Sequence, residues 1–523
     1  MNRECSNPNW ISQALERWSH RINRRRRKLL AIFEEKTMSI VSLEPRPLWH
    51  FFNALNSIPR PSKKEEQVRE WVIGLGNDWG FETLTDEVGN VLIRKPATAG
   101  MENKRHIVLQ SHLDMVCQKN ADTVFDFDTQ GIKMYVDGDW VRAEGTTLGA
   151  DNGIGVATIL AVLDSTDIPH PAIDALFTID EETGMTGALG LKGGFLQGDI
   201  LLNLDTEDDD ELSIGCAGGV DVTSTGTYEA EAIQAGVKQL RIRLTGGSGG
   251  HSGMDIHKGI ANMNKLMNRL LIESLGAVDF RLASVQGGGL RNAIPRESEA
   301  VLVLDPADET EFKSTLVEAF EAVKAEYATT DPELSLSCET EATTVTHAMP
   351  EEDQLAVLMA IQTVPVGIHR MSPDIENLVQ TSNNLARVEI AAGTISLQCL
   401  CRSSVDSEKD DNANSIACAF GLAGLQTEFS GQYPGWTPNP SSAIVATMKA
   451  LYEEKYNESP RVLACHAGLE CGILGTNYPE MDMVSFGPNI RGAHSPDECV
   501  QISSVQKFWG FFLDALQRIP NKA

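Results

Sequence analysis

The chain has 523 residues, 42% of them hydrophobic, which is enough apolar material for more than one folded domain. It carries 44 Lys and Arg against 73 Asp and Glu, a net charge of −29 that would repel a phosphate backbone or an anionic lipid surface. Partners of either kind, nucleic acid or membrane, are therefore disfavoured, and no apolar run reaches the ~20 residues of a membrane-spanning helix.

Residues 1–37 differ in charge from the rest of the chain. They hold nine basic and four acidic residues, which gives +5 and leaves −34 for the remainder. Short basic runs such as 24–28 are weak evidence for a nucleic-acid-binding or targeting segment. A second methionine, Met38, precedes a sequence that is typical of the start of a folded domain. We interpret 1–37 either as an N-terminal extension that is disordered or helical, or as an artefact of an upstream start site.

The cysteines and the N-terminus predict a cytoplasmic protein. Ten cysteines are too few for a disulfide scaffold and none forms a C-x-x-C pair. The N-terminus also lacks the apolar core and small-residue cleavage site of a signal peptide.

From Trp49 onward, helical and strand-like patterns alternate. The predicted elements, in chain order, are a helix at 65–75, strands at 88–93 and 107–110, a helix at 153–163, and strands at 174–179 and 200–204. Several of these strands are apolar throughout, which is typical of a sheet covered by helices on both faces.

After Gly218 the pattern changes to a more open α+β texture. It predicts a half-exposed strand at 238–245, a helix at 259–275, and a further strand pair at 300–304 and 394–402. The Pro- and Gly-rich stretch 431–440 marks a boundary. Beyond it, a helix at 442–456, a strand at 483–486 and a helix at 505–519 resume the first texture. We therefore predict an α/β catalytic domain at 38–218 and 429–523, interrupted by an inserted α+β domain at 219–428. The acidic run 207–211 is predicted to be a solvated loop.

Polar residues follow several of these strands. His112 and Asp114 share a face after strand 107–110, where the carboxylate could orient a metal-binding imidazole. Taken alone, a His-x-Asp pair is more often simply hydrogen-bonded. Asp151 lies between glycines ahead of a helix, where a helix N-cap is the plain alternative.

Acidic residues also end strands 174–179 and 200–204, in Glu181-Glu182 and in Asp205, and His494 follows strand 483–486. The carboxyl ends of strands line the ligand crevice of open α/β sheets. Two histidines and three carboxylates can hold two Zn²⁺ ions if one carboxylate bridges them, and +4 against −3 leaves room for a hydroxide. The set is His112, Asp151, Glu182, Asp205 and His494, with the adjacent Glu181 left as general base.

Taken together, the motifs resemble those of the M20 metallopeptidases from about Met38 to the C-terminus. The strings are Ser-His112-Leu-Asp114, Gly-Ala-Asp151-Asn-Gly-Ile-Gly, Asp-Glu181-Glu182-Thr-Gly-Met, Asn-Leu-Asp205, Gly-Gly-His251-Ser-Gly, Leu-Arg291-Asn292-Ala-Ile-Pro-Arg and His466-Ala-Gly-Leu-Glu-Cys-Gly. The resemblance implies a zinc-peptidase-like catalytic domain, with a central mixed sheet flanked by helices, and an inserted lid that often mediates homodimerisation. It implies a dipeptidase of broad specificity, Xaa-His included, that uses two divalent metal ions, Zn²⁺ first with Co²⁺ or Mn²⁺ as substitutes.

The resemblance also implies a role for each residue. His112 and Asp205 would hold one metal, Glu182 and His494 the other, and Asp151 would bridge them, with a hydroxide between the metals as nucleophile. Asp114 would orient His112, and Glu181 would move the proton. The remaining residues would meet the substrate: His251 at the scissile carbonyl, in cis or in trans, and Arg402 and Asn292 in substrate binding.

Two alternatives stay open. One is an M20 amidohydrolase or tripeptidase that acts on N-acyl amino acids or longer peptides. The other is a metal- or peptide-binding protein without catalysis, against which the presence of Glu181 and all five ligands argues. The glycine loop 246–253 is a poor nucleotide site because it lacks the P-loop lysine and the third glycine of the dinucleotide fingerprint.

Overall fold

The structure is a computed structural model that describes residues 39–522, so the predicted extension 1–37 lies outside the described residues. These residues form two units. Unit 1 contains 39–212, 442–461 and 480–522, and unit 2 contains 213–441 and 462–479. The chain thus passes between the units four times, and two of these points fall within strands β8 (Glu211–Cys216) and β22 (Arg461–Cys465).

Unit 1 is built on a mixed sheet in which six strands follow the order β1-β2-β6-β3-β7-β23. Their bounds are β1 Glu82–Thr85, β2 Val91–Lys95, β3 Ile107–His112, β6 Ile173–Thr178, β7 Ile200–Asn203 and β23 Asp482–Ser485. The strands β6, β3, β7 and β23 are parallel, whereas β1 and β2 pair antiparallel. Every residue of β3 and β6 is buried, including the polar residues Gln110 and Asp174, as expected for central strands of a sheet covered on both faces. The carboxyl ends of β3, β6, β7 and β23 therefore meet at one edge.

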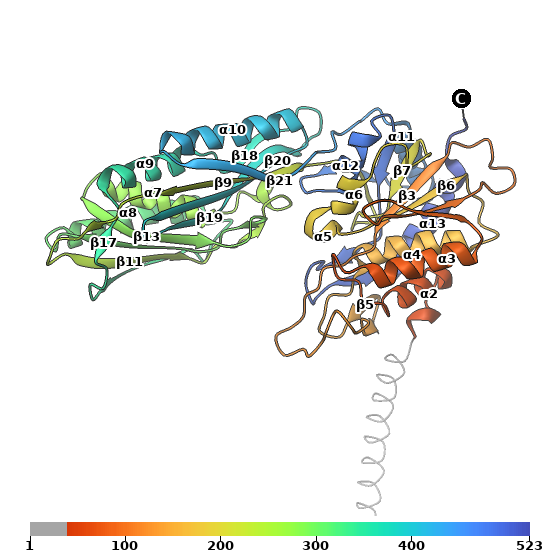
Figure 1. Cartoon of the computed structure of the whole chain (residues 1–523), viewed down its shortest axis with the longest axis horizontal. Helices are drawn as coiled ribbons and strands as arrows, with labels where there is room; N and C mark the ends of the chain where they lie inside the picture. The colour runs from red at the N-terminus through yellow and green to blue at the C-terminus, as the bar shows by residue number, and fades with distance from the viewer. Residues whose placement is uncertain (1–38, 523) are drawn as a thin grey trace, which may run out of the picture. The chain divides into compact units, whose positions relative to one another are not determined.

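Helices cover this sheet (Figure 1). They are α2 (Arg46–Leu55), α3 (Glu66–Asp78), α4 (Ala150–Asp164), α5 (Glu181–Gly184), α6 (Thr186–Gly190), α11 (Ala443–Tyr456) and α13 (Ile502–Arg518), with a 3-10 turn, η1, at Ile40–Ser42. The apolar α4 is buried along nearly its whole length between α2 and β3, while α11 packs on α13 and contacts β23. A small sheet in the order β24 (Ile490–Arg491), β25 (Cys499–Gln501), β5 (Trp140–Ala143) and β4 (Met134–Asp137) completes the unit.

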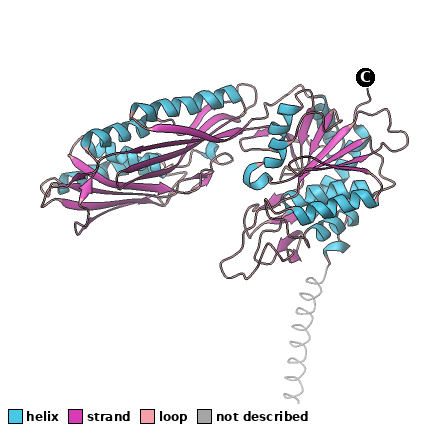
Figure 2. Cartoon of the chain, viewed as in Figure 1, coloured by secondary structure: helices cyan, strands magenta, loops and turns pink. Residues whose placement is uncertain are grey.

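Unit 2 is an antiparallel sheet with helices packed against it (Figure 2). The strand order is β16 (Ser335–Glu341), β11 (Lys238–Thr245), β15 (Ser298–Leu304), β13 (Phe280–Gly288), β19 (Val379–Ala391), β20 (Thr394–Ser403), β9 (Gly218–Thr227) and β21 (Gln426–Tyr433), with β18 (Gly367–Met371) paired to β19. The helices packed against the sheet are α7 (Met263–Leu275), α8 (Glu309–Glu326), α9 (Glu351–Thr363) and α10 (Asp406–Leu422). The unit also contains α12 (Glu470–Asn477) and a 3-10 turn, η2, at Ile256–Lys258. Two short ribbons pair β10 (Glu231–Ala232) with β17 (His347–Ala348) and β12 (Gly250–His251) with β14 (Ala293–Ile294).

The predicted α/β class is confirmed, and most predicted elements lie within a few residues of their predicted bounds. The two strands predicted at 300–304 and 394–402 are present as β15 and β20, but they do not pair with each other, because β15 pairs with β11 and β13 whereas β20 pairs with β19 and β9. Likewise, α7 begins at Met263 rather than at 259, since the Asn262 side chain caps it by accepting the N–H of Lys265.

The acidic run 207–211 is not simply a solvated loop. Asp208 contacts both Arg461 and Arg491, and Asp209 contacts Lys507. Glu211 begins strand β8. Within 39–522, every helix is too short or too polar to span a lipid bilayer.

Candidate metal centre

Strand β3 delivers His112 to the sheet edge, where its side chain is 1% exposed. The ring nitrogen Nδ1 lies 3.2 Å from the backbone oxygen of Asp114 and 3.3 Å from its carboxylate. With Nδ1 held in this way, Nε2 is left facing other acids. Although burial opposes it, the hydrogen bond with His112 lowers the pKa of Asp114 to about 2, so this carboxylate is ionised at neutral pH.

Asp151 lies at the start of α4, and its side chain reaches two histidines. Its Oδ1 is 3.2 Å from Nε2 of His112, and its Oδ2 is 3.3 Å from Nε2 of His494. Its backbone ψ of 109° is not helical, and the N-cap residue of α4 is Gly149 rather than Asp151. The carboxylate of Asp151 thus faces the cluster rather than the backbone of α4.

The other two acids complete two groups that share Asp151. Asp205, after β7, lies 3.6 Å from Nε2 of His112, and Glu182, in α5, lies 3.1 Å from Nε2 of His494. The candidate ligand atoms within each group all lie within 4.8 Å of one another. The structure therefore brings together all five residues that the sequence suggested, in two sets joined by one carboxylate.

The electrostatics of this cluster favour the addition of positive charge. Burial and the charge of Asp151 raise the pKa of Asp205 to about 6, and the same causes raise the pKa of Glu182. Hydrogen bonds to Asp151 and Glu182 raise the pKa of His494 to about 11. Asp205 and Glu182 are therefore harder to ionise than free carboxyl groups, and a cation bound beside them would favour their charged forms.

The residues present fit a pair of divalent cations. Imidazole nitrogens and carboxylate oxygens are the donors that Zn²⁺ and related ions accept. In addition, Oε1 of Glu182 is buried and has no hydrogen-bond partner among residues 39–522. A buried, unpartnered carboxylate oxygen at the shared edge is the atom that a cation would satisfy.

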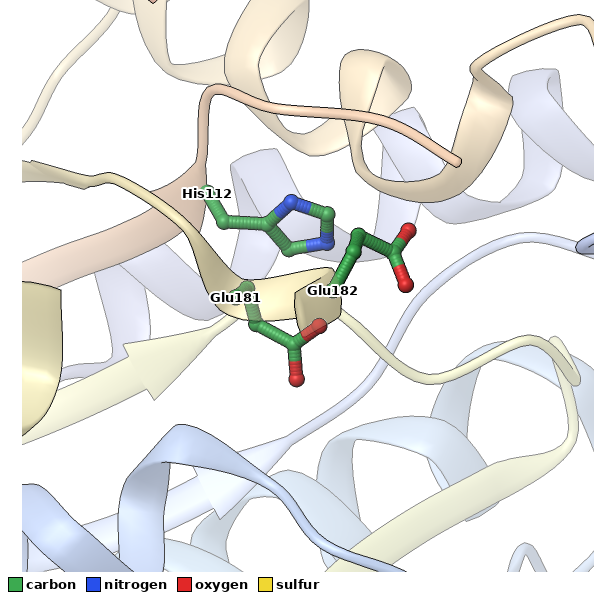
Figure 3. A group of neighbouring side chains, drawn as sticks. All are labelled: His112, Glu181 and Glu182. Atoms are coloured by element: carbon green, nitrogen blue, oxygen red, sulfur yellow. The ribbon is translucent and has the colours of Figure 1, made fainter. Parts of the chain in front are cut away.

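Glu181 and Glu182 point in different directions from one short turn. Figure 3 shows the two glutamate side chains diverging near the imidazole of His112, and these three residues also offer ligand atoms that lie within 4.8 Å of one another. One side chain holds the turn: the carboxylate of Asp114 accepts the N–H of Glu181 at 3.0 Å and the N–H of Glu182 at 3.2 Å. Asp114 therefore orients His112 and both glutamates together.

Three other predicted residues lie in unit 2. His251 and Asn292 lie close to each other, because β12 pairs His251 with Ala293 of β14 and Ser252 N–H donates to the Asn292 carbonyl. The N–H groups of Gly253 and Met254 donate to Nδ1 of His251, which places the ring proton on Nε2. Arg402 lies on β20, 5% exposed, and donates to the hydroxyl of Tyr433.

Sequence reasoning missed two buried ionisable side chains that hold the backbone of this centre. The carboxylate of Glu498, 2% exposed, accepts backbone N–H groups of the loop before Asp151. The guanidinium of Arg60, 1% exposed, donates to the carbonyl of Leu113 after β3 and to the carbonyl of Gly149 before Asp151. Glu498 stands only four residues after His494, so its distance from a candidate ligand was a usable signal; nothing local distinguishes Arg60.

Comparison with known proteins finds peptidases that are similar along most of the chain. The profile of peptidase family M20/M25/M40 matches residues 108–518. The chain is 44% identical over 481 residues to the cytosol non-specific dipeptidase of Escherichia coli strain K12, covering 92% of this chain and 99% of that relative. The solved aminoacylhistidine dipeptidase of Vibrio alginolyticus has a TM-score of 0.85 and 45% identity, over 93% of this chain and 99% of that one. A Staphylococcus aureus tripeptidase, at 15% identity and a TM-score of 0.53 over 91% of this chain and 99% of its own, is similar in fold.

Proposed function

The chain belongs to peptidase family M20/M25/M40, and from that premise we propose that it is a metal-dependent dipeptidase of broad specificity that accepts Xaa-His dipeptides. One observation carries the proposal: Asp151 presents one carboxylate oxygen to His112 and the other to His494. A single side chain thereby joins two ligand groups. Both relatives at 44% and 45% identity are named as dipeptidases.

We assign two divalent cations to this cluster, Zn²⁺ first, with Co²⁺ or Mn²⁺ as substitutes. His112 and Asp205 hold one, Glu182 and His494 hold the other, and Asp151 serves both; the two groups that share it support this assignment. When bound, such cations polarise a peptide carbonyl and lower the pKa of water.

Glu181 moves the proton in this proposal. Its carboxylate takes the proton of the attacking water and delivers it to the leaving amine. The separate direction of its side chain from that of Glu182 supports a separate task (Figure 3). The carboxylate of Asp114 fixes the turn by accepting the N–H groups of Glu181 and Glu182, and it orients the imidazole of His112 through Nδ1.

Residues of unit 2 bind the substrate in this proposal. The proton on Nε2 makes His251 a hydrogen-bond donor suited to the oxyanion that develops on the carbonyl. Arg402 pairs with the terminal carboxylate of the dipeptide, and Asn292 contacts its backbone. We further propose that 219–428 acts as a lid through which two chains dimerise, that His251 serves the site in cis or in trans, and that the protein is cytoplasmic.

The test is a side-by-side assay of the purified chain with Ala-His, other dipeptides, tripeptides and N-acetyl amino acids, with metal content measured on the same sample. The proposal predicts rapid hydrolysis of dipeptides and two metal ions per chain. Faster turnover of tripeptides or N-acetyl amino acids would favour the amidohydrolase or tripeptidase alternative. Metal binding without turnover of any peptide would favour the non-catalytic one.

A further inference from the structure

The loop that leads to Asp151 is held by a carboxylate from a distant part of the chain. Oε2 of Glu498 accepts the N–H of Leu148 at 2.7 Å and that of Gly149 at 2.8 Å. Oε1 accepts the N–H of Ala150 at 2.7 Å and that of Asp151 at 3.2 Å. Four consecutive backbone donors therefore converge on one buried carboxylate.

The backbone of this loop is shaped for an anion. Gly149 has a φ of 70°, in the left-handed region that glycine adopts most easily. Successive N–H groups that turn inward in this way form an anion-binding concavity. Here the acceptor is the side chain of Glu498, so the last donor of the set, the N–H of Asp151, has a fixed position.

Arg60 holds the same loop through its carbonyl groups. Its Nη2 donates to the carbonyl of Gly149 at 2.6 Å. Its Nη1 donates to the carbonyls of Leu113 and Asp114 at 3.0 and 2.8 Å, at the end of β3. One buried guanidinium thus joins the loop that bears Asp151 to the strand that bears His112.

From these contacts we infer that Glu498 and Arg60 are positioning residues that fix Asp151 relative to His112 before any cation binds. The inference rests on the proposed function, because it concerns the carboxylate assigned to both cations. A bridging ligand must meet two ions at once, so an error in its placement weakens both sites. If the protein itself fixes that side chain, the binding of metal does not have to order it.

The test uses the full-length chain carrying Glu498→Gln, stripped of metal and titrated with Zn²⁺ against a chromogenic chelator. Glutamine keeps the volume but offers one acceptor oxygen, and its NH₂ group faces two N–H donors. We expect Zn²⁺ affinity to fall about 10–100-fold. Excess Zn²⁺ should restore much of the dipeptide turnover, which a general loss of folding would not allow.

Asp174→Asn is the matched control. Asp174 is also fully buried, accepts the N–H of Gln197 and faces His106, but it lies at the other end of β6 from Glu181. We expect Asp174→Asn to lower the melting temperature and to leave Zn²⁺ affinity within about twofold of wild type, since it touches no ligand.

A second measurement needs no variant. In metal-free wild-type protein, hydrogen exchange should find the amides of 148–151 as protected as those of the middle of α4. Exchange there at the rate of an exposed loop would overturn the inference, as would wild-type Zn²⁺ affinity in a folded Glu498→Gln protein. If the wild-type chain itself bound no Zn²⁺ and cleaved no dipeptide, the proposed function would fail, while the exchange data would still report separately on the loop.

Discussion

Replacing Asp114 by asparagine tests whether one carboxylate organises the centre. The side chain is fully buried and accepts from the N–H groups of Glu181 and Glu182 and from the hydroxyl of Ser62. It also faces Nδ1 of His112 at 3.3 Å. Asparagine has nearly the same shape but only one acceptor oxygen, so its NH₂ group must face at least one of these donors.

Two effects should follow in Asp114→Asn. A buried donor left without an acceptor costs about 1–3 kcal/mol of folding free energy. The imidazole of His112 also loses its ionised partner, and loss of such a partner weakens metal binding about 10–100-fold, or about 1.4–2.7 kcal/mol. Dipeptide turnover should fall by at least the same factor at limiting Zn²⁺, because the turn that bears Glu181 is no longer fixed.

The assay combines denaturant unfolding of the metal-free chain, Zn²⁺ titration and hydrolysis of Ala-His. Asp128→Asn is the control, since that carboxylate is 51% exposed and pairs with the exposed Lys64. A surface pair of this kind contributes about 0–1 kcal/mol. Wild-type Zn²⁺ affinity and turnover in Asp114→Asn would refute the reasoning.

Four further predictions follow from the same contacts. Glu181→Gln should retain both metals but lose hydrolysis by orders of magnitude, because the general base is gone; near-normal turnover with full metal content would reject the assignment. Chelation by EDTA should abolish activity, and added Zn²⁺, Co²⁺ or Mn²⁺ should restore it, whereas full activity in a metal-stripped sample would count against any metal mechanism. Gly155→Ala places a methyl group 2.7 Å from the carbonyl of Leu204 and should cost about 1–3 kcal/mol in thermal unfolding, while Gly74→Ala, with open space around it, should cost nothing. Burial, with the charge of Arg402, lowers the pKa of His466 to about 3, so this imidazole is neutral when folded and unfolding takes up its proton. The free energy of unfolding should therefore be unaffected by His466 above pH 6.5 and should decrease as the pH falls from 6.5 toward 3. His466→Gln should weaken this decrease, and the same dependence of stability on pH in the variant would contradict the prediction.

The candidate ligands could be predicted because each follows an apolar strand or begins an apolar helix. Short apolar runs located β3, β6, β7 and β23, and parallel strands end at one edge, so the polar residues that follow them converge there. The roles of these residues stay predictions until metal and turnover are measured.

What the sequence did not indicate are contacts made to backbone. Glu498 binds N–H groups almost 350 positions earlier in the chain, and any residue type offers such a group. The pairing of the strands at 300–304 and 394–402 could not be predicted for a related reason. The residue patterns at 300–304 and 394–402 predict two strands but not their neighbours, and other strands of unit 2 supply the edges with which each pairs.

Because the chain passes between the two units four times, a single recombination event between related genes cannot exchange one complete unit. A single exchange of 213–441 would carry most of unit 2 but would leave 462–479 from the other parent. That segment supplies His466, whose Nε2 lies 2.7 Å from the hydroxyl of Ser382, and the carbonyls of Cys465 and Ala467 that accept the N–H of Ala217. In such a hybrid, the interior of unit 2 would be built from segments of two different parents. Unit 2 therefore cannot be exchanged as a whole by one pair of crossovers.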